Sequence, residues 1–153
     1  MILKLIEDIK IKQTQVTIEY KEKDIKVDKL IDFVTHLDEL DDNIMASCDG
    51  QIHSLNIRDI LYIESVDRKT FCYTYSEVYE SNLKLYEIEE KYQFTDMMRI
   101  SKSTIVNLKK IDSLKPDFGG KILATMENGE KLYISRQYSP LLKEKLGIGG
   151  KRL

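Results

Sequence analysis

The chain has 153 residues, of which 42% are hydrophobic and 33% charged, and it contains seven glycines and two prolines. This length and composition are typical of one soluble globular domain with at most a small appendage, and they exclude a low-complexity chain. No apolar run approaches the length of a membrane span, and Glu7 and Asp8 interrupt the first segment, which excludes a signal peptide. We therefore expect a cytoplasmic protein with no membrane insertion.

The net charge of −2 is mildly unfavourable for a nucleic-acid partner, but the charges are unevenly distributed along the chain. Residues 1–50 carry 7 Lys/Arg against 12 Asp/Glu, a balance of −5, whereas residues 95–153 carry 12 against 6, a balance of +6. Any surface that binds a polyanion is therefore expected in the C-terminal part.

Residues 1–43 are predicted to form an extension of strands and one helix. Val16, Ile18 and Tyr20 alternate with polar residues at the period of a half-buried strand, and Leu3 and Leu5 mark an earlier one. Apolar residues then recur at helical spacing between residues 25 and 40, on one face of an amphipathic helix: Val27, Leu30, Ile31, Val34 and Leu37.

The acidic stretch 38–42 marks a boundary after this helix. Asp41 and Asp42 could form a magnesium or phosphoacceptor pair, but a solvated helix end is the favoured interpretation.

Residues 44–147 are predicted to form a mainly β domain with short helices. Strands are expected at 44–45, 51–55, 59–64 and 71–75, with Asp49-Gly50 as a hairpin turn. Leu85, Ile88 and Tyr92 share one face of a short helix that Ser81 or Asn82 could cap.

Further strands are expected at 111–114, 122–126 and 132–134, with a turn at 116–120 and a hairpin at Asn128-Gly129. A last helix follows Ser135 and ends at Leu146, before Gly147 and a flexible tail at 148–153; Pro140 either bends it or makes it restart after Ser139. Short strands with frequent turns favour an antiparallel β protein of class α+β.

The sequence lacks the constellations that catalysis or metal binding requires. His36 and His53 lie in a helix pattern and a strand pattern, and Cys48 and Cys72 are too far apart for a zinc motif, so we expect reduced and buried thiols. Gly119-Gly120 has no following Lys-Ser/Thr for a phosphate loop. We expect no enzymatic activity, no metal, no cofactor and no small-molecule substrate.

The segment Arg99-Ile-Ser-Lys-Ser-Thr-Ile-Val-Asn107 sets hydroxyls and cations beside the apolar pair Ile105-Val106. On its own it fits a capped turn that leads into a core strand. It also fits a rigid loop whose polar side chains contact DNA phosphates and base edges.

Four motifs in order resemble the LytTR family, the DNA-binding domain of LytR/AlgR-type bacterial transcription regulators. They are Asp59-Ile-Leu-Tyr-Ile-Glu-Ser65, the segment from Phe94 through Asn107, Asn128-Gly129, and Ile134-Ser-Arg136, within about residues 48–147. The resemblance implies stacked small antiparallel sheets that read duplex DNA with loops. No recognition helix is expected.

Carried onto this sequence, the resemblance implies three DNA-binding loops. They comprise Arg68, Lys69 and Thr70 in the first, Ser101, Lys102 and Ser103 in the second, and Arg136 and Gln137 in the third. Ile105 and Val106 should then be core residues, and Asn107 should satisfy backbone groups at a turn. Many family members have a basic residue at the position of Gln137, and glutamine favours adenine where arginine favours guanine.

The resemblance implies a stand-alone, response-regulator-like transcriptional regulator without a receiver domain. Its N-terminal extension either dimerises the protein on paired half-sites or caps the sheet. Two alternatives compete with this interpretation: a protein-interaction module of the same fold without DNA affinity, and a small enzyme that uses Lys102 or Asp67 in a cleft.

Overall fold

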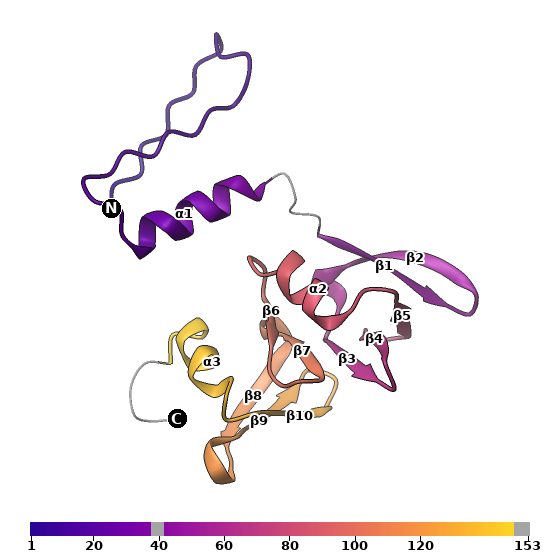
Figure 1. The fold of residues 1–153 in the computed structure, drawn as a ribbon. Coiled ribbons are helices and arrows are strands. Elements are labelled where there is room, and N and C mark those ends of the chain that lie inside the picture. Colours follow the sequence, from indigo (N-terminus) through magenta and orange to yellow (C-terminus); the bar gives the residue numbers. More distant parts are fainter. Residues whose placement is uncertain (38–41, 149–153) are drawn as a thin grey trace. The chain divides into compact units, whose positions relative to one another are not determined.

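The computed structural model describes residues 1–37 and 42–148 and divides the chain into two compact units, residues 1–38 and 39–153 (Figure 1). Most of the predicted acidic boundary, including Asp41, and all of the predicted tail except Ile148 lie outside the described residues.

The N-terminal unit contains the predicted amphipathic helix as α1 (Ile25–Thr35). Asp24 caps it, because its Oδ1 accepts hydrogen bonds from the backbone N–H groups of Lys26 and Val27 at 3.0 and 2.9 Å. Val27 is the buried member of the apolar face, at 9% exposure. Leu30 and Val34 are half-buried, and Ile31 and Leu37 are exposed, so this unit covers the apolar stripe only in part.

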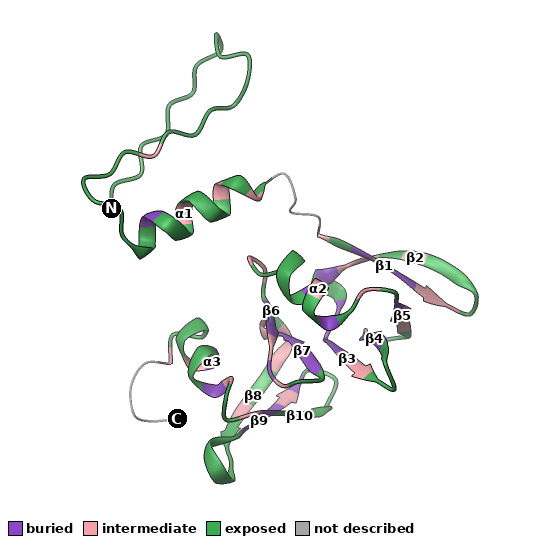
Figure 2. Cartoon of the chain, in the orientation of Figure 1, coloured by how far each residue is buried: buried purple, intermediate pink, exposed green. Residues whose placement is uncertain are grey.

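The predicted N-terminal strands are not formed in the described part of residues 1–37. Val16 and Tyr20, which should have lined a half-buried face, are 55% and 52% exposed, and nearly the whole segment is exposed in Figure 2. Alternating apolar residues predict a strand only where a neighbouring strand takes the backbone hydrogen bonds and a core covers one face. This unit supplies neither, so the prediction was wrong.

A seven-stranded antiparallel sheet dominates the second unit, in the order β2-β1-β5-β4-β3-β7-β6. Its strands are β1 (Asn43–Cys48), β2 (Gln51–Asn56), β3 (Tyr62–Val66), β4 (Lys69–Tyr73), β5 (Val78–Ser81), β6 (Met97–Arg99) and β7 (Thr104–Asn107). A 3-10 turn, η2 (Ile57–Asp59), occupies the start of the segment predicted as a strand at 59–64. The mainly β fold class is confirmed.

A second antiparallel sheet has three strands in the order β10-β9-β8: β8 (Ile111–Pro116), β9 (Ile122–Met126) and β10 (Lys131–Ile134). The other elements are α2 (Leu85–Lys91), η3 (Leu108–Lys110), η4 (Phe118–Gly120) and α3 (Ser139–Lys145). Pro140 lies in the first turn of α3, where its missing N–H costs no hydrogen bond, so the helix starts later than predicted and does not bend. Ser139 is its first residue, and Tyr138 holds the cap position.

Two hairpins of the large sheet use the same two-residue turn. Asp49 and Gly50 have φ of 50° and 75°, as expected for the primed turns that match strand twist, and the Asp49-Gly50 prediction is confirmed. The turn between β3 and β4 has φ of 50° at Asp67 and 66° at Arg68, although it contains no glycine.

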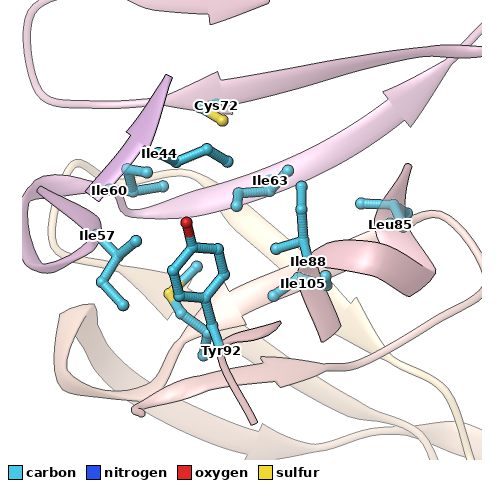
Figure 3. Close-up of a cluster of buried hydrophobic side chains, with 10 residues drawn as sticks. Ile44, Ile57, Ile60, Ile63, Cys72, Leu85, Ile88, Tyr92 and Ile105 are labelled. Atoms are coloured by element: carbon cyan, nitrogen blue, oxygen red, sulfur yellow. The ribbon is translucent and has the colours of Figure 1, made fainter. Parts of the chain in front are cut away.

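One face of the large sheet is covered by α2. Leu85, Ile88 and Tyr92 are 6%, 0% and 1% exposed, as their spacing predicted, and they pack against sheet residues that include Ile63 and Ile105 (Figure 3). The hydroxyl of Tyr92 donates to the carbonyl of Asn43 at 2.7 Å, which satisfies its polar end.

A second core forms on the opposite face of β3 and β7. Side chains alternate across a strand, so Tyr62 and Val106 point away from α2 and belong to a cluster with residues of the second sheet and α3: Ile122, Ala124, Met126, Ile134 and Leu142. The central strands are thus buried on both faces, which explains the continuous apolar run at 60–63.

The two cysteines differ in their environment. Cys72 is fully buried in the first core, as predicted, whereas Cys48 is only half-buried at the end of β1, so that prediction was wrong for Cys48. Both are free thiols.

Asn107 fixes the end of β7, and its replacement should destabilise the fold. Its Nδ2 donates to the carbonyl of the fully buried Ile60 at 2.9 Å, and its Oδ1 accepts from the Lys109 N–H at 3.1 Å. Asn107→Ala leaves the Ile60 carbonyl without its partner, so we expect the free energy of unfolding in urea to fall by about 1–3 kcal/mol.

Asn56→Ala is the matched control for this prediction. Asn56 also caps a 3-10 turn, with its Oδ1 accepting from the Arg58 N–H at 2.9 Å, but this hydrogen bond is exposed. Loss of this hydrogen bond in Asn56→Ala should lower the free energy of unfolding by roughly half as much as Asn107→Ala does, or less. Equal losses for the two variants would contradict the role assigned to the buried amide.

Candidate nucleic-acid interface

The turn between β6 and β7, residues 100–103, holds the second set of predicted DNA-binding residues. Lys102 and Ser103 are exposed, and Ser101 is half-buried. The hydroxyl of Ser101 accepts a hydrogen bond from the Ser103 N–H at 3.2 Å, which closes the turn on itself. Ile105 and Val106, at 1% and 0% exposure, anchor the following strand as predicted.

Arg99 holds this turn from inside. Its Nε donates to the carbonyl of Ser101 at 2.7 Å, its second terminal nitrogen donates to the carbonyl of Lys102, and its first terminal nitrogen pairs with Glu89 of α2 at 3.2 Å. The Arg99 side chain is only 18% exposed. Its guanidinium is therefore committed to positioning the turn, which the sequence pattern did not reveal.

Two backbone hydrogen bonds attach the neighbouring segments to the same turn. The N–H of Ser65, near the end of β3, donates to the carbonyl of Ser103 at 2.8 Å. The N–H of Ser135, directly after β10, donates to the carbonyl of Ile100 at 2.9 Å. All three predicted loops thus begin at one hydrogen-bonded junction.

The first predicted loop is a tight turn at Asp67-Arg68, with Lys69 already in β4. Arg68 and Lys69 are exposed, whereas Thr70 is 3% exposed and faces the interior, so the structure does not present the Thr70 side chain at this surface. Lys69 lies 3.7 Å from Glu80, an exposed pair that contributes little to stability.

Arg68 occupies the second turn position that Gly50 occupies in the β1–β2 hairpin. A left-handed conformation costs a non-glycine residue about 1–2 kcal/mol. Lys84, which sequence reasoning did not single out, donates from Nζ to the Arg68 carbonyl at 3.4 Å. Non-glycine residues in such costly backbone conformations cluster at functional sites.

The third predicted loop precedes α3, and both Arg136 and Gln137 are exposed. A Cβ atom on Gly120 would lie 2.9 Å from Cγ and 3.1 Å from Cδ of Arg136, so the aliphatic stem of this arginine packs directly on Gly120. The hydroxyl of Ser139 donates to the Gly120 carbonyl at 2.9 Å. The stem is held in place while the guanidinium reaches outward.

Two buried titratable groups lie in the cores of this unit. Burial raises the pKa of the Cys72 thiol to about 12 and that of the Tyr62 hydroxyl to about 12, with the charge of Glu130 adding to the latter, so both stay protonated at neutral pH. The ring of His53 packs edge-on against Tyr79. Among the described residues, no group of three or more His, Cys, Asp or Glu side chains could hold a metal ion.

The model of the LytTr DNA-binding domain family matches residues 50–147, which include both sheets and α3. The chain belongs to the LytTr family. The resemblance seen in the four sequence motifs is thereby confirmed.

Relatives and a solved structure agree with this assignment. An uncharacterized HTH-type transcriptional regulator of Staphylococcus aureus strain NCTC 8325 / PS 47 is 30% identical over 122 residues, which cover 80% of this chain and 82% of the relative. A regulator with the same kind of name from Staphylococcus aureus strain MRSA252 is 29% identical over 122 residues, with the same shares of the two chains covered. A LytTr DNA-binding domain from Bacillus cereus has a TM-score of 0.66 at 23% identity, covering 70% of this chain and 98% of that one, and shares the fold.

The second unit, called the LytTr unit below because the family model matches its residues 50–147, does not have the helix-turn-helix arrangement that the names of the relatives mention. In residues 42–148, α2 and α3 are separated by five strands, so no two consecutive helices are joined by a short turn.

No helix within the two described ranges is long and apolar enough to cross a membrane.

Replacement of Arg99 should loosen the LytTr turn at 100–103 without unfolding the protein. Arg99→Gln removes the ion pair with Glu89 and both carbonyl contacts, so we expect faster amide hydrogen exchange at Ser101 to Ser103. Glu89→Gln removes the ion pair alone and should change exchange much less. Unchanged protection of the turn in Arg99→Gln would contradict the positioning role.

Replacement of Gly120 should displace Arg136. Gly119 and Gly120 have φ of 74° and 79°, so alanine at either position should cost about 1 kcal/mol of unfolding free energy. The control variant Gly119→Ala adds a Cβ with no heavy atom within 4 Å, whereas in Gly120→Ala the new Cβ meets Arg136. The NMR signal of the Arg136 guanidinium should therefore move only in Gly120→Ala, and equal shifts in both variants would refute the packing.

Proposed function

We propose that the protein is a sequence-specific transcriptional regulator that binds duplex DNA through three turns, at residues 66–69, 100–103 and 135–138. The observation that carries the proposal is a pair of backbone hydrogen bonds, which the N–H groups of Ser65 and Ser135 donate to the carbonyls of Ser103 and Ile100. These two bonds hold the three cation-bearing turns at fixed positions relative to one another. Such an arrangement is needed if all three turns are to contact one rigid duplex at the same time. The names of the family and of the relatives supply the class of partner.

Each turn contributes a long exposed cation, namely Arg68, Lys102 and Arg136, and the first turn adds Lys69, which pairs with Glu80. Within residues 1–37 and 42–148, no ion pair neutralises any of the first three side chains. An arginine can donate two hydrogen bonds to guanine in the major groove, and a glutamine can pair with adenine. Arg136 and Gln137 are therefore proposed to read adjacent bases, while Ser101 and Ser103 contact phosphates or hold the turn.

The chemistry of the surface favours binding over catalysis. The turns present cations, hydroxyls and amides, so we propose that the protein acts without a cofactor or a chemical step. The proposal places it in the cytoplasm with the DNA it regulates.

We further propose that the N-terminal unit joins two copies into a homodimer. Its first residues expose large apolar side chains, including Ile2 at 95%, Leu5 at 84% and Ile9 at 96%. Exposed apolar groups concentrated in one segment are typical of an interaction surface. A dimer would place two LytTr units on paired half-sites and raise specificity.

Binding to a duplex fragment from upstream of its own gene tests the DNA proposal. The logarithm of the association constant should fall linearly with the logarithm of the salt concentration, because bound cations displace counterions from phosphates. Arg136→Ala should weaken binding by roughly 1–3 kcal/mol and relax the preference at one base pair.

Arg58→Ala provides the matched control. Arg58 is an exposed arginine of η2 that pairs with Asp42 at 3.4 Å, outside the three turns. Its removal should leave the base preference unchanged. Salt-independent binding by the parent, or the same base preference in Arg136→Ala as in the parent, would contradict the proposal.

Deletion of the N-terminal unit tests the dimer. Light scattering should give twice the monomer mass for residues 1–153 and the monomer mass for residues 42–153, which keep β1 and both cores intact. The same oligomeric state for both proteins would show that the extension does not dimerise the chain.

A further inference from the structure

The turn between β8 and β9, residues 117–121, adjoins the third of the three proposed DNA-binding turns. The stem of Arg136 packs on Gly120, and the Ser139 hydroxyl donates to the Gly120 carbonyl at 2.9 Å. A duplex that reaches the guanidinium of Arg136 would therefore pass close to this turn, which no motif in the sequence connects with DNA.

Phe118 lies at the tip of this turn and is 93% exposed. In the larger unit, the next most exposed large hydrophobic residue among those described is Ile52 at 74%. An aromatic side chain exposed to this degree gains none of the stabilisation that burial of its apolar surface would give. Such a side chain is unfavourable in water unless a partner covers it.

The backbone of the turn is fixed, so the exposure of Phe118 does not follow from a loose loop. Asp117 Oδ1 accepts from the Phe118 N–H at 2.7 Å, and the Asp117 N–H donates to the Lys121 carbonyl at 2.8 Å. Gly119 and Gly120 supply the positive φ values that the reversal requires. The side chain is held outward by a closed turn.

The surroundings of Phe118 suit a negatively charged partner. Lys115 precedes the turn, Lys121 is its last residue, and both are exposed, while Arg136 lies against Gly120. Asp117 adds one negative charge, with its Oδ1 accepting from the Phe118 N–H, and the three cations outnumber it. An apolar wedge between cations is the combination that proteins use to enter the minor groove, where the aromatic ring packs on sugars and base edges.

We propose that the turn 117–121 is a fourth DNA contact, in which Phe118 packs into the minor groove beside the position read by Arg136 and Lys121 contacts a flanking phosphate. This inference rests on the proposed function. It assigns a contact that adds affinity and local distortion of the DNA, next to the base contacts of the third turn.

Hydroxyl-radical footprinting and binding titrations on the upstream duplex fragment test this contact. Phe118→Ala should bind about tenfold more weakly, at the lower end of what burial of a phenylalanine contributes, with an unchanged salt slope. It should also lose protection of a few sugars next to those lost in Arg136→Ala. Lys121→Ala should reduce the salt slope by about one unit.

Tyr86→Ala is the matched control, because Tyr86 is a 66% exposed aromatic residue on α2. It should bind and protect the fragment as the parent does, and equal urea midpoints for Phe118→Ala and the parent will show that both are folded. If the parent binds the fragment and Phe118→Ala shows the same affinity and footprint, the proposed fourth contact is wrong, while the three-turn proposal is unaffected. A parent protein that does not bind the fragment would overturn this inference together with the proposed function.

Discussion

The arrangement of the candidate DNA surface depends on the carbonyl groups of residues 100–103. All four accept hydrogen bonds. The carbonyls of Ile100 and Ser103 accept from the backbone N–H groups of Ser135 and Ser65. Those of Ser101 and Lys102 accept from the guanidinium of Arg99. Main-chain hydrogen bonds fix geometry independently of the side chains that they carry. The outward residues of this turn can therefore change while the relation of the three turns persists.

This junction is rigid because the strands that lead to it are buried on both faces. Ile63 and Ile105 pack under α2, while Tyr62 and Val106 pack under the second sheet, so neither β3 nor β7 can shift without opening a core. The ion pair between Arg99 and Glu89 connects the turn to α2 as well. Affinity can then be gained without a large ordering cost, because the turns are already placed.

The sequence predicted those parts of the fold whose signals are local. Glycine marked the hairpins at Asp49-Gly50 and Asn128-Gly129, and helical spacing identified the buried face of α2. The turn at Asp67-Arg68 carries no glycine, and the role of Arg99 depends on carbonyl groups that only the folded turn presents, so neither could be predicted. The sequence placed Thr70 in a loop, whereas the turn has only two residues and Thr70 already lies in β4. The alternation of Val16 and Tyr20 could not show that a partner strand is missing.

We propose that three turns, distant in sequence, act as one DNA-binding surface. Titration of 15N-labelled protein with the upstream duplex, followed by NMR, tests it most directly. We expect the amide signals of Arg68, Lys102 and Arg136 to shift along one common saturation curve, while those of the β1–β2 hairpin stay unchanged. Shifts confined to one of the three turns, or centred on the β1–β2 hairpin, would contradict it.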